Sequence, residues 1–204
     1  MVKRTAGCIL SFEGIDASGK NTQSRMLFDF LMAKGGIEPI YLSFPDYETR
    51  IGQEIRNFLA GKKEYNQEAR HLLYAANRYE KKEDIEKALA EGRVVVVNRY
   101  CESNLAYGVA NGLPLEWLRE IESRMPQADF VFLLRASPGL SERRKKITLR
   151  DRYESDMRFL QRVSDVYDAL AKSGQWFVID ADSSIQSVHN EVSKLALSVI
   201  KEKV

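Results

Sequence analysis

The sequence predicts an α/β fold, a five-stranded parallel sheet with helices on both faces. Five short apolar runs rich in β-branched and aromatic residues have the composition of strands that are buried on both sides. Between them lie stretches with the apolar spacing of amphipathic helices. Strands and helices that alternate in this way form βαβ units, whose right-handed crossovers cover both faces of the sheet. The predicted strands are residues 8–12, 39–44, 94–97, 130–134 and 176–179.

Three of the stretches between strands show helical spacing most clearly. Apolar residues three and four positions apart share one face of a helix. They are Met26, Leu27, Phe30 and Leu31 after the first strand, Leu72, Leu73, Ala76 and Tyr79 after the second, and Ile85 and Leu89 before the third. No repeat, low-complexity tract or Pro/Gly-rich linker divides the 204 residues, so we expect a single domain over residues 1–204.

Charge and composition exclude several functional classes. The chain has 31 Lys and Arg against 29 Asp and Glu, so no overall field would hold it on nucleic acid or on a membrane surface. No apolar run approaches the roughly 20 residues of a membrane span. Lys3 and Arg4 precede a short apolar stretch that ends at Glu13 without a cleavage site. We therefore expect a cytoplasmic protein with neither nucleic acid nor a membrane as partner.

Cysteine and histidine offer few candidate ligands. Cys8 and Cys101 lack Cys-x-x-Cys spacing and are interpreted as reduced thiols. His71 and His189 stand alone on helical patterns, and we assign neither a chemical role. In a parallel sheet, ligands bind beyond the carboxyl ends of the strands, so the polar residues that follow the apolar runs are the better candidates.

A glycine-rich loop follows the first strand and precedes a helix. It matches the pattern G-x-x-x-x-G-K through Gly14, Gly19 and Lys20. The glycines let backbone N–H groups turn toward phosphate oxygens, the helix adds its positive end, and Lys20 can bridge the terminal phosphates. An ordinary βα turn is the simpler alternative, but the lysine and the context favour a P-loop NTPase-type sheet with a triphosphate ligand. The residues predicted to bind it are Gly14, Asp16, Ala17, Ser18, Gly19, Lys20, Asn21 and Thr22.

One residue departs from the P-loop pattern. Asn21 stands where a Ser or Thr hydroxyl normally coordinates Mg²⁺, with Thr22 one place later. An amide carbonyl can still bind Mg²⁺. We therefore expect Mg²⁺ to be held by Asp16, by Asn21 and by the oxygen atoms of the nucleotide.

Further polar and aromatic runs follow the other strands and mark one predicted helix. They are Phe44-Pro45-Asp46-Tyr47, residues 72–80, Asn98-Arg99-Tyr100 with Ser103, Asn104 and Tyr107, and Asp151-Arg152-Tyr153-Glu154. Together with Phe12-Glu13-Gly14, these runs resemble the thymidylate kinase family in order and spacing, from about residue 8 to residue 182. The resemblance implies a nucleoside monophosphate kinase fold with a lid, a homodimer, and transfer of the γ-phosphoryl group of ATP to the small-molecule substrate dTMP, giving dTDP.

One predicted helix carries a candidate nucleobase clamp. Tyr74 and Arg78 are four residues apart and share a face, so the ring can lie against a base while the guanidinium reaches a base carbonyl. On the helix alone, a core tyrosine and a surface arginine would be the commoner interpretation. The resemblance favours the clamp. It implies that Tyr74 stacks on thymine, Arg78 contacts the base, Arg99 binds the acceptor phosphate, Asn104 approaches the base edge, Tyr107 lies near the sugar, and Phe44 and Tyr47 wall the pocket.

Asn98 is a second departure, because the family has aspartate at this position. The neutral side chain removes a negative charge beside two polyanions. This either weakens Mg²⁺ binding or eases repulsion between the phosphates, and the sequence is compatible with both.

A basic segment, residues 141–152, follows the fourth strand. Such runs usually form a solvated face, but the family has its mobile lid here. The loop carries Ala17 and Ser18 where some members have an arginine that reaches the transferred phosphate, and lid arginines replace it in other members. The resemblance thus implies catalytic roles in charge stabilisation for Arg143, Arg144 and Arg150, together with Lys20 and Arg99.

No histidine or carboxylate is a convincing catalytic base, which favours an acceptor phosphate over an acceptor hydroxyl. A phosphate with a second pKa of about 6 is mostly dianionic at neutral pH and attacks without giving a proton to the protein. Two alternatives stay open. One is a kinase for another pyrimidine nucleotide, such as dUMP, or for a deoxynucleoside. The other is a nucleotide-binding protein whose catalysis is weakened at Asn21 and Asn98.

Overall fold

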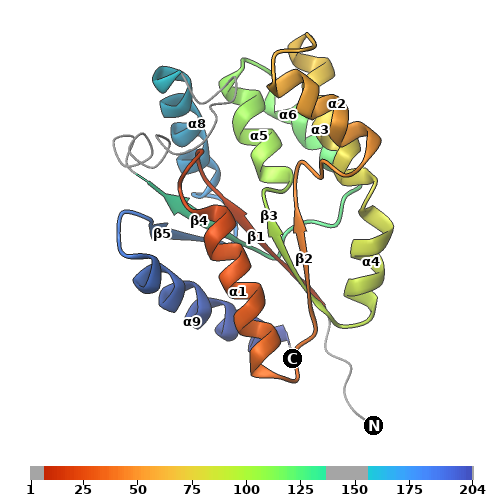
Figure 1. Cartoon of the computed structure of the whole chain (residues 1–204). Coiled ribbons are helices and arrows are strands. Elements are labelled where there is room, and N and C mark those ends of the chain that lie inside the picture. The colour runs from red at the N-terminus through yellow and green to blue at the C-terminus, as the bar shows by residue number, and fades with distance from the viewer. Residues whose placement is uncertain (1–6, 137–155, 204) are drawn as a thin grey trace.

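The computed structural model of the protein describes residues 7–136 and 156–203 (Figure 1). All five predicted strands are present and parallel, in the order β2-β3-β1-β4-β5. The chain leaves β1 toward one edge of the sheet and leaves β3 toward the other, and this reversal opens a crevice at the carboxyl ends of the two strands. The strands are β1 (Cys8–Glu13), β2 (Pro39–Ser43), β3 (Val94–Asn98), β4 (Phe130–Arg135) and β5 (Trp176–Asp180).

Helices cover both faces of the sheet (Figure 1). One face is covered by α1 (Lys20–Lys34) and α9 (Ile185–Lys203). The other is covered by α4 (Lys82–Ala90), α5 (Cys101–Ala110) and α8 (Met157–Leu170). The remaining described helices lie toward the carboxyl ends of the strands; they are α2 (Arg50–Leu59), α3 (Gln67–Tyr79) and α6 (Leu115–Glu122). α3 packs against α2, α5 and α6, and α6 also packs against α5.

Alternate residues of the central strand enter different cores. In β1, Leu10 and Phe12 lie in the same apolar cluster as Leu27 of α1, whereas Ile9 lies in a cluster with Ile85 of α4. All five side chains are fully buried. Each contributes roughly 1.5–3 kcal/mol through removal of apolar surface from water. The runs are continuously apolar because helices cover the strands on both sides.

The helix predicted around residues 72–79 is present as α3, but its buried face is not the apolar one that the spacing indicates. Leu72 is 47% exposed. The reason is that α3 packs against α2, α5 and α6 and borders a cavity, instead of covering the apolar surface of the sheet. The buried residues of α3 are His71, Ala75, Asn77 and Arg78.

Both cysteines are free and buried, Cys8 in β1 and Cys101 at the start of α5. Over residues 7–136 and 156–203, no helix combines the length and the hydropathy that a bilayer crossing requires.

Candidate functional site

Two cavities open beyond the carboxyl ends of the strands, and Asp16 and Arg99 border both of them. The first cavity is lined by side chains from α3, from α5 and from the segment after β2. All the residues predicted to bind the acceptor line it, namely Phe44, Tyr47, Tyr74, Arg78, Arg99, Asn104 and Tyr107. The second cavity lies between the predicted phosphate loop and the start of α9, and every predicted donor residue except Gly14 lines it.

The second cavity is built around the loop between β1 and α1. Gly14 has a φ of +139°, and a Cβ atom there would lie 2.5 Å from the carbonyl oxygen of Leu134. Gly19 has a φ of +98° and is the N-cap of α1, so the N–H groups of the first turn have no side-chain cap and can serve an anion. Lys20 is buried, and its Nζ donates to the carbonyl of Ile15 at 2.7 Å. The loop therefore encloses backbone donors and one ammonium group.

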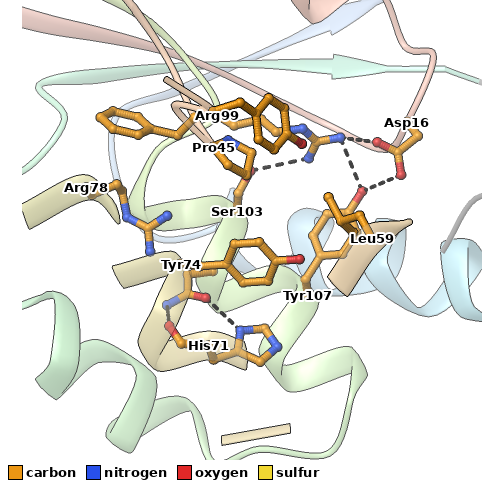
Figure 2. Close-up of a pocket in the computed structure, with 12 residues that line it drawn as sticks. Asp16, Pro45, Leu59, His71, Tyr74, Arg78, Arg99, Ser103 and Tyr107 are labelled. Carbon is orange, nitrogen blue, oxygen red and sulfur yellow. Dashed lines mark hydrogen bonds and ion pairs between the residues drawn. The ribbon is translucent and has the colours of Figure 1, made fainter. Parts of the chain in front are cut away.

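Arg99 and Asp16 form an ion pair at the border between the cavities (Figure 2). Arg99 follows β3 and Asp16 lies in the loop after β1, and these strands are neighbours. The Tyr107 hydroxyl donates to Asp16 Oδ2 at 3.0 Å. Asp16, which is predicted to be a metal ligand, thus has both carboxylate oxygens engaged by protein groups in this structure. Arg99 lies within reach of ligands in either cavity.

The other end of the first cavity holds Tyr74 and Arg78, one turn apart on α3. Figure 2 shows the Tyr74 ring between the Arg99 end and the Arg78 end. Arg78 is 3% exposed, so the alternative of a surface arginine is wrong. Its Nε donates to Glu122 Oε2 at 3.2 Å, and its Nη2 pairs with Glu122 Oε1. Glu122 uses two of the five N–H donors of the guanidinium, which leaves others for a ligand.

Asn104 lines the first cavity, but its amide is engaged within the protein. Its Nδ2 donates to Glu122 Oε1 at 2.6 Å and to the carbonyl of His71 at 3.2 Å. Its Oδ1 accepts from His71 Nδ1 at 2.6 Å. The predicted contact between Asn104 and the base edge stays a prediction, and the structure gives Asn104 a place in the network that supports Arg78.

Two residues of this network, His71 and Glu122, are not predicted from the sequence. His71, to which we assign no chemical role above, lines the first cavity and contacts the Tyr74 ring edge-on at 5.8 Å between ring centres. Its position three residues before Tyr74 is the sequence signal that places it on the same face of α3. Glu122 belongs to no motif, and no local pattern marks it.

Protonation of His71 is expected to destabilise the fold in acid. Burial lowers the pKa of His71 to about 4 from the ordinary 6.5, with Arg70 and Arg78 acting in the same direction and Asn104 and Glu122 opposing them. Between pH 6.5 and about pH 4, His71 is protonated in the unfolded chain but stays neutral in the folded chain. The stability that is present above pH 6.5 is therefore lost progressively down to about pH 4. A pKa lower by about 2.5 corresponds to about 3 kcal/mol at most.

Urea unfolding between pH 4 and pH 7 measures this dependence. We expect His71→Asn to flatten the decline in unfolding free energy relative to the wild-type protein. His189→Asn is the matched control. Burial also lowers the pKa of His189 on α9, but this side chain is only partly buried, so we expect a smaller change in slope. If the unfolding free energies of the wild-type protein and of His71→Asn depend equally on pH, protonation of His71 does not cause the loss of stability in acid.

Asn21 and Asn98 both border the second cavity, but their side-chain oxygens differ in hydrogen bonding. Asn21 Oδ1 accepts from the Tyr41 hydroxyl at 3.3 Å. Asn98 Nδ2 donates to Ser43 Oγ at 3.0 Å. Asn98 Oδ1 is buried, and within the described residues it has no hydrogen-bond partner. An oxygen in this state suits a cation or an ordered water.

The predicted lid, residues 141–152, lies outside the described residues. This includes Arg143, Arg144 and Arg150, and the Asp151-Arg152-Tyr153-Glu154 motif lies outside them too. The roles implied for these residues stay predictions.

Residues 12–192 match the sequence model of a protein family described as thymidylate kinase. The chain belongs to the thymidylate kinase family. The matched segment contains the phosphate loop, both ends of the first cavity and the Arg99 turn. The resemblance stated from the sequence is therefore confirmed.

Relatives in this family align with almost the whole chain. The thymidylate kinase of Dictyostelium discoideum is 33% identical over 202 residues, which are 99% of this chain and 89% of the relative. The thymidylate kinase of Arabidopsis thaliana is 34% identical, with 96% of this chain and 73% of the relative covered. The human thymidylate kinase is 31% identical, with 96% and 92% covered.

The fold agrees with a solved member of the thymidylate kinase family. The structure of thymidylate kinase from Candida albicans matches with a TM-score of 0.85, covering 98% of this chain and 95% of that one. The sequence identity is 24%, so this likeness concerns the fold alone. The predicted nucleoside monophosphate kinase fold is confirmed over the described residues.

Proposed function

We propose that this protein transfers the γ-phosphoryl group of ATP to dTMP, giving dTDP. The observation that carries the proposal is the shared border of the two cavities, where Arg99 and Asp16 separate a phosphate loop from a pocket with an aromatic ring and an arginine. Two phosphorylated ligands held end to end would meet at this border. Such positioning converts a reaction between two substrates into an effectively unimolecular step.

ATP is the donor, and its phosphates occupy the second cavity. The backbone N–H groups of the loop and of the first turn of α1 bind the phosphate oxygens, and Lys20 bridges the terminal ones. The buried position of Lys20, on the carbonyl of Ile15, supports this role because the ammonium is already oriented before the nucleotide arrives.

dTMP is the acceptor and occupies the first cavity. Tyr74 stacks on the base, Arg78 donates to a base carbonyl, and Arg99 binds the phosphate. Tyr107 lies near the sugar and disfavours a 2′-hydroxyl, Asn104 lies toward the base edge, and Phe44 and Tyr47 form walls. The separation of Arg78 from Arg99, with the Tyr74 ring between them, supports this orientation of the nucleotide (Figure 2).

Catalysis then consists of alignment and charge stabilisation. The acceptor phosphate is its own nucleophile, so no protein group has to remove a proton. In a loose, in-line transition state, charge spreads over the oxygens of the transferred group. Lys20 and Arg99 stabilise that charge, together with Arg143, Arg144 and Arg150 of the lid.

Mg²⁺ fits the second cavity by the chemistry of its oxygen atoms. Asp16, Asn21 and Asn98 border the cavity, and Asn98 Oδ1 is buried without a partner among the described residues. Mg²⁺ prefers oxygen ligands and needs only one or two from the protein when it is bound with nucleotide phosphates. We infer that Asp16 and Asn21 would hold the ion in exchange for part of their present contacts with protein groups, with Asn98 beside them. When bound, Mg²⁺ neutralises charge on the phosphate oxygens.

Asn98→Asp is expected to lower the Mg²⁺ concentration that gives half-maximal velocity, by roughly tenfold. The substitution restores a carboxylate next to the phosphates at nearly unchanged size. A Mg²⁺ titration of the steady-state velocity measures the change, with Asn190→Asp on the exposed face of α9 as the control. A titration curve that coincides with that of the wild-type protein would place Asn98 outside the influence of the metal.

A coupled assay of ADP release tests the proposed reaction. Velocities with dTMP, dUMP, CMP and thymidine are compared with the velocity without an acceptor. We expect turnover to depend on the acceptor and to be fastest with dTMP. A preference for thymidine would indicate a nucleoside kinase, and ATP binding without acceptor-dependent turnover would indicate a nucleotide-binding protein.

The remaining features of the proposal rest on the sequence. The family resemblance supports a homodimer, and the nearly balanced charge supports a protein without a nucleic acid or membrane partner. We also propose a cytoplasmic location. Sedimentation at micromolar protein concentration tests the dimer.

A further inference from the structure

The turn that carries Arg99 has a backbone conformation that is uncommon for a residue with a side chain. The φ of Arg99 is +62°, in the left-handed region. Such conformations persist where the surrounding structure holds them, and they concentrate at functional sites. Here the segment 12–16 supplies three contacts. The carbonyl of Phe12 accepts from Arg99 N at 3.0 Å, Glu13 Oε1 accepts from Tyr100 N at 2.7 Å, and Asp16 pairs with the guanidinium.

Glu13 lines neither cavity, but its carboxylate makes several contacts around the Arg99 turn. Its side chain is completely buried at the end of β1. Its Oε2 accepts from Ser103 Oγ at 2.5 Å and from the Tyr167 hydroxyl at 2.9 Å, and these two hydroxyls lie 3.1 Å apart. Ser103 Oγ also lies 3.5 Å from Arg99 Nη1. One carboxylate therefore joins β1, the Arg99 turn with the start of α5, and α8.

The partners of Glu13 distinguish this cluster from an ordinary buried carboxylate. Two of its three donors, Tyr100 N and Ser103 Oγ, come from the four residues that follow Arg99 in the chain. The third donor, the Tyr167 hydroxyl, comes from α8. A buried acceptor satisfied on all sides in this way fixes the geometry of the groups around it.

We propose that Glu13 is the positioning residue for Arg99. Its carboxylate clamps the Arg99 turn to the strand that leads into the phosphate loop, and Ser103 and Tyr167 orient that carboxylate. The donor loop and the acceptor arginine then form one rigid unit at the border of the cavities. This rests on the proposed function, in which Arg99 binds the acceptor phosphate. A displacement of the reacting groups by about 1 Å is enough to cost roughly 10²-fold in rate.

Tyr167→Phe tests the proposal, because it removes one hydroxyl from a residue that lines neither cavity. We expect kcat with dTMP to fall by roughly ten- to a hundredfold and KM for dTMP to rise, while KM for ATP stays within twofold. Tyr79→Phe is the matched control. The Tyr79 hydroxyl donates to the carbonyl of Ile121 at 3.1 Å, outside both cavities, and its loss should lower the melting temperature without changing the kinetics. Glu13→Gln should show the pattern of Tyr167→Phe with a larger loss.

The outcomes separate the positioning role from the reaction itself. If the wild-type protein shows no dTMP-dependent turnover, the proposed function fails and the positioning role fails with it. If the wild-type protein turns over but Tyr167→Phe has the kinetics of Tyr79→Phe, only the positioning role is overturned. If Glu13→Gln does not fold, the comparison of the two tyrosine variants decides alone.

Discussion

Replacement of Lys20 with methionine is expected to lower kcat for dTMP-dependent ADP release by about 10²–10³-fold. Lys20 Nζ is the charged donor within the phosphate loop, held on the carbonyl of Ile15. Methionine keeps most of the length and the apolar stem of the side chain, but it removes the positive charge that the transferred phosphoryl group meets. Steady-state rates at saturating ATP and dTMP measure the change.

Lys34→Met is the matched control for this variant. Lys34 lies in the last turn of the same helix, where it is exposed and far from the loop in sequence. We expect its kcat to stay within about twofold of the wild-type value, as surface substitutions rarely disturb more. A Lys20→Met variant that keeps more than a tenth of the wild-type kcat would remove Lys20 from the catalytic groups.

Glu122→Ala is expected to lower the free energy of unfolding by about 3–5 kcal/mol, because it leaves Arg78 as a buried charge without its partner. The side chains of Arg78 and Glu122 are 4% and 3% exposed. Asn104 loses the same acceptor. Arg78 lines the first cavity but not the second, so we also expect KM for dTMP to rise more than KM for ATP. Urea unfolding and steady-state kinetics measure the two effects.

Asp168→Ala provides the comparison with a solvated ion pair. Asp168 accepts from Arg135 Nε at 3.1 Å, and both side chains are 40% exposed or more. A pair of this kind contributes up to about 1 kcal/mol. If Glu122→Ala lowers the free energy of unfolding no more than Asp168→Ala does, the buried pair between Arg78 and Glu122 does not stabilise the first cavity.

The parts of the molecule that depend on local sequence are predictable from it. The strands are marked by apolar runs because helices cover both faces, and the loop at Gly14, Gly19 and Lys20 is marked because its backbone needs glycine and its ligand needs a cation. These requirements act over a few neighbouring residues, so a single sequence displays them. The family resemblance adds Tyr74 and Arg78, which a helix pattern alone assigns to core and surface.

The supporting residues are not predictable in this way, because their partners lie far along the chain. Glu122 contacts Arg78 across 44 residues, and Tyr167 contacts Glu13 across 154. A glutamate at the end of a short amphipathic helix has the same local pattern whether it faces water or a buried guanidinium. The buried face of α3 is misjudged for the same reason, since the tertiary packing of α2, α5 and α6 decides it.

The ion pair between Arg99 and Asp16 borders the cavities of both nucleotides. A phosphate that arrives from either side changes the field at the same two groups, so the binding free energy of one nucleotide depends on the presence of the other. Thermodynamic linkage makes this dependence reciprocal. ATP changes the dissociation constant of dTMP by the same factor by which dTMP changes that of ATP. A titration with one nucleotide at several fixed concentrations of the other therefore reports on both sites at once.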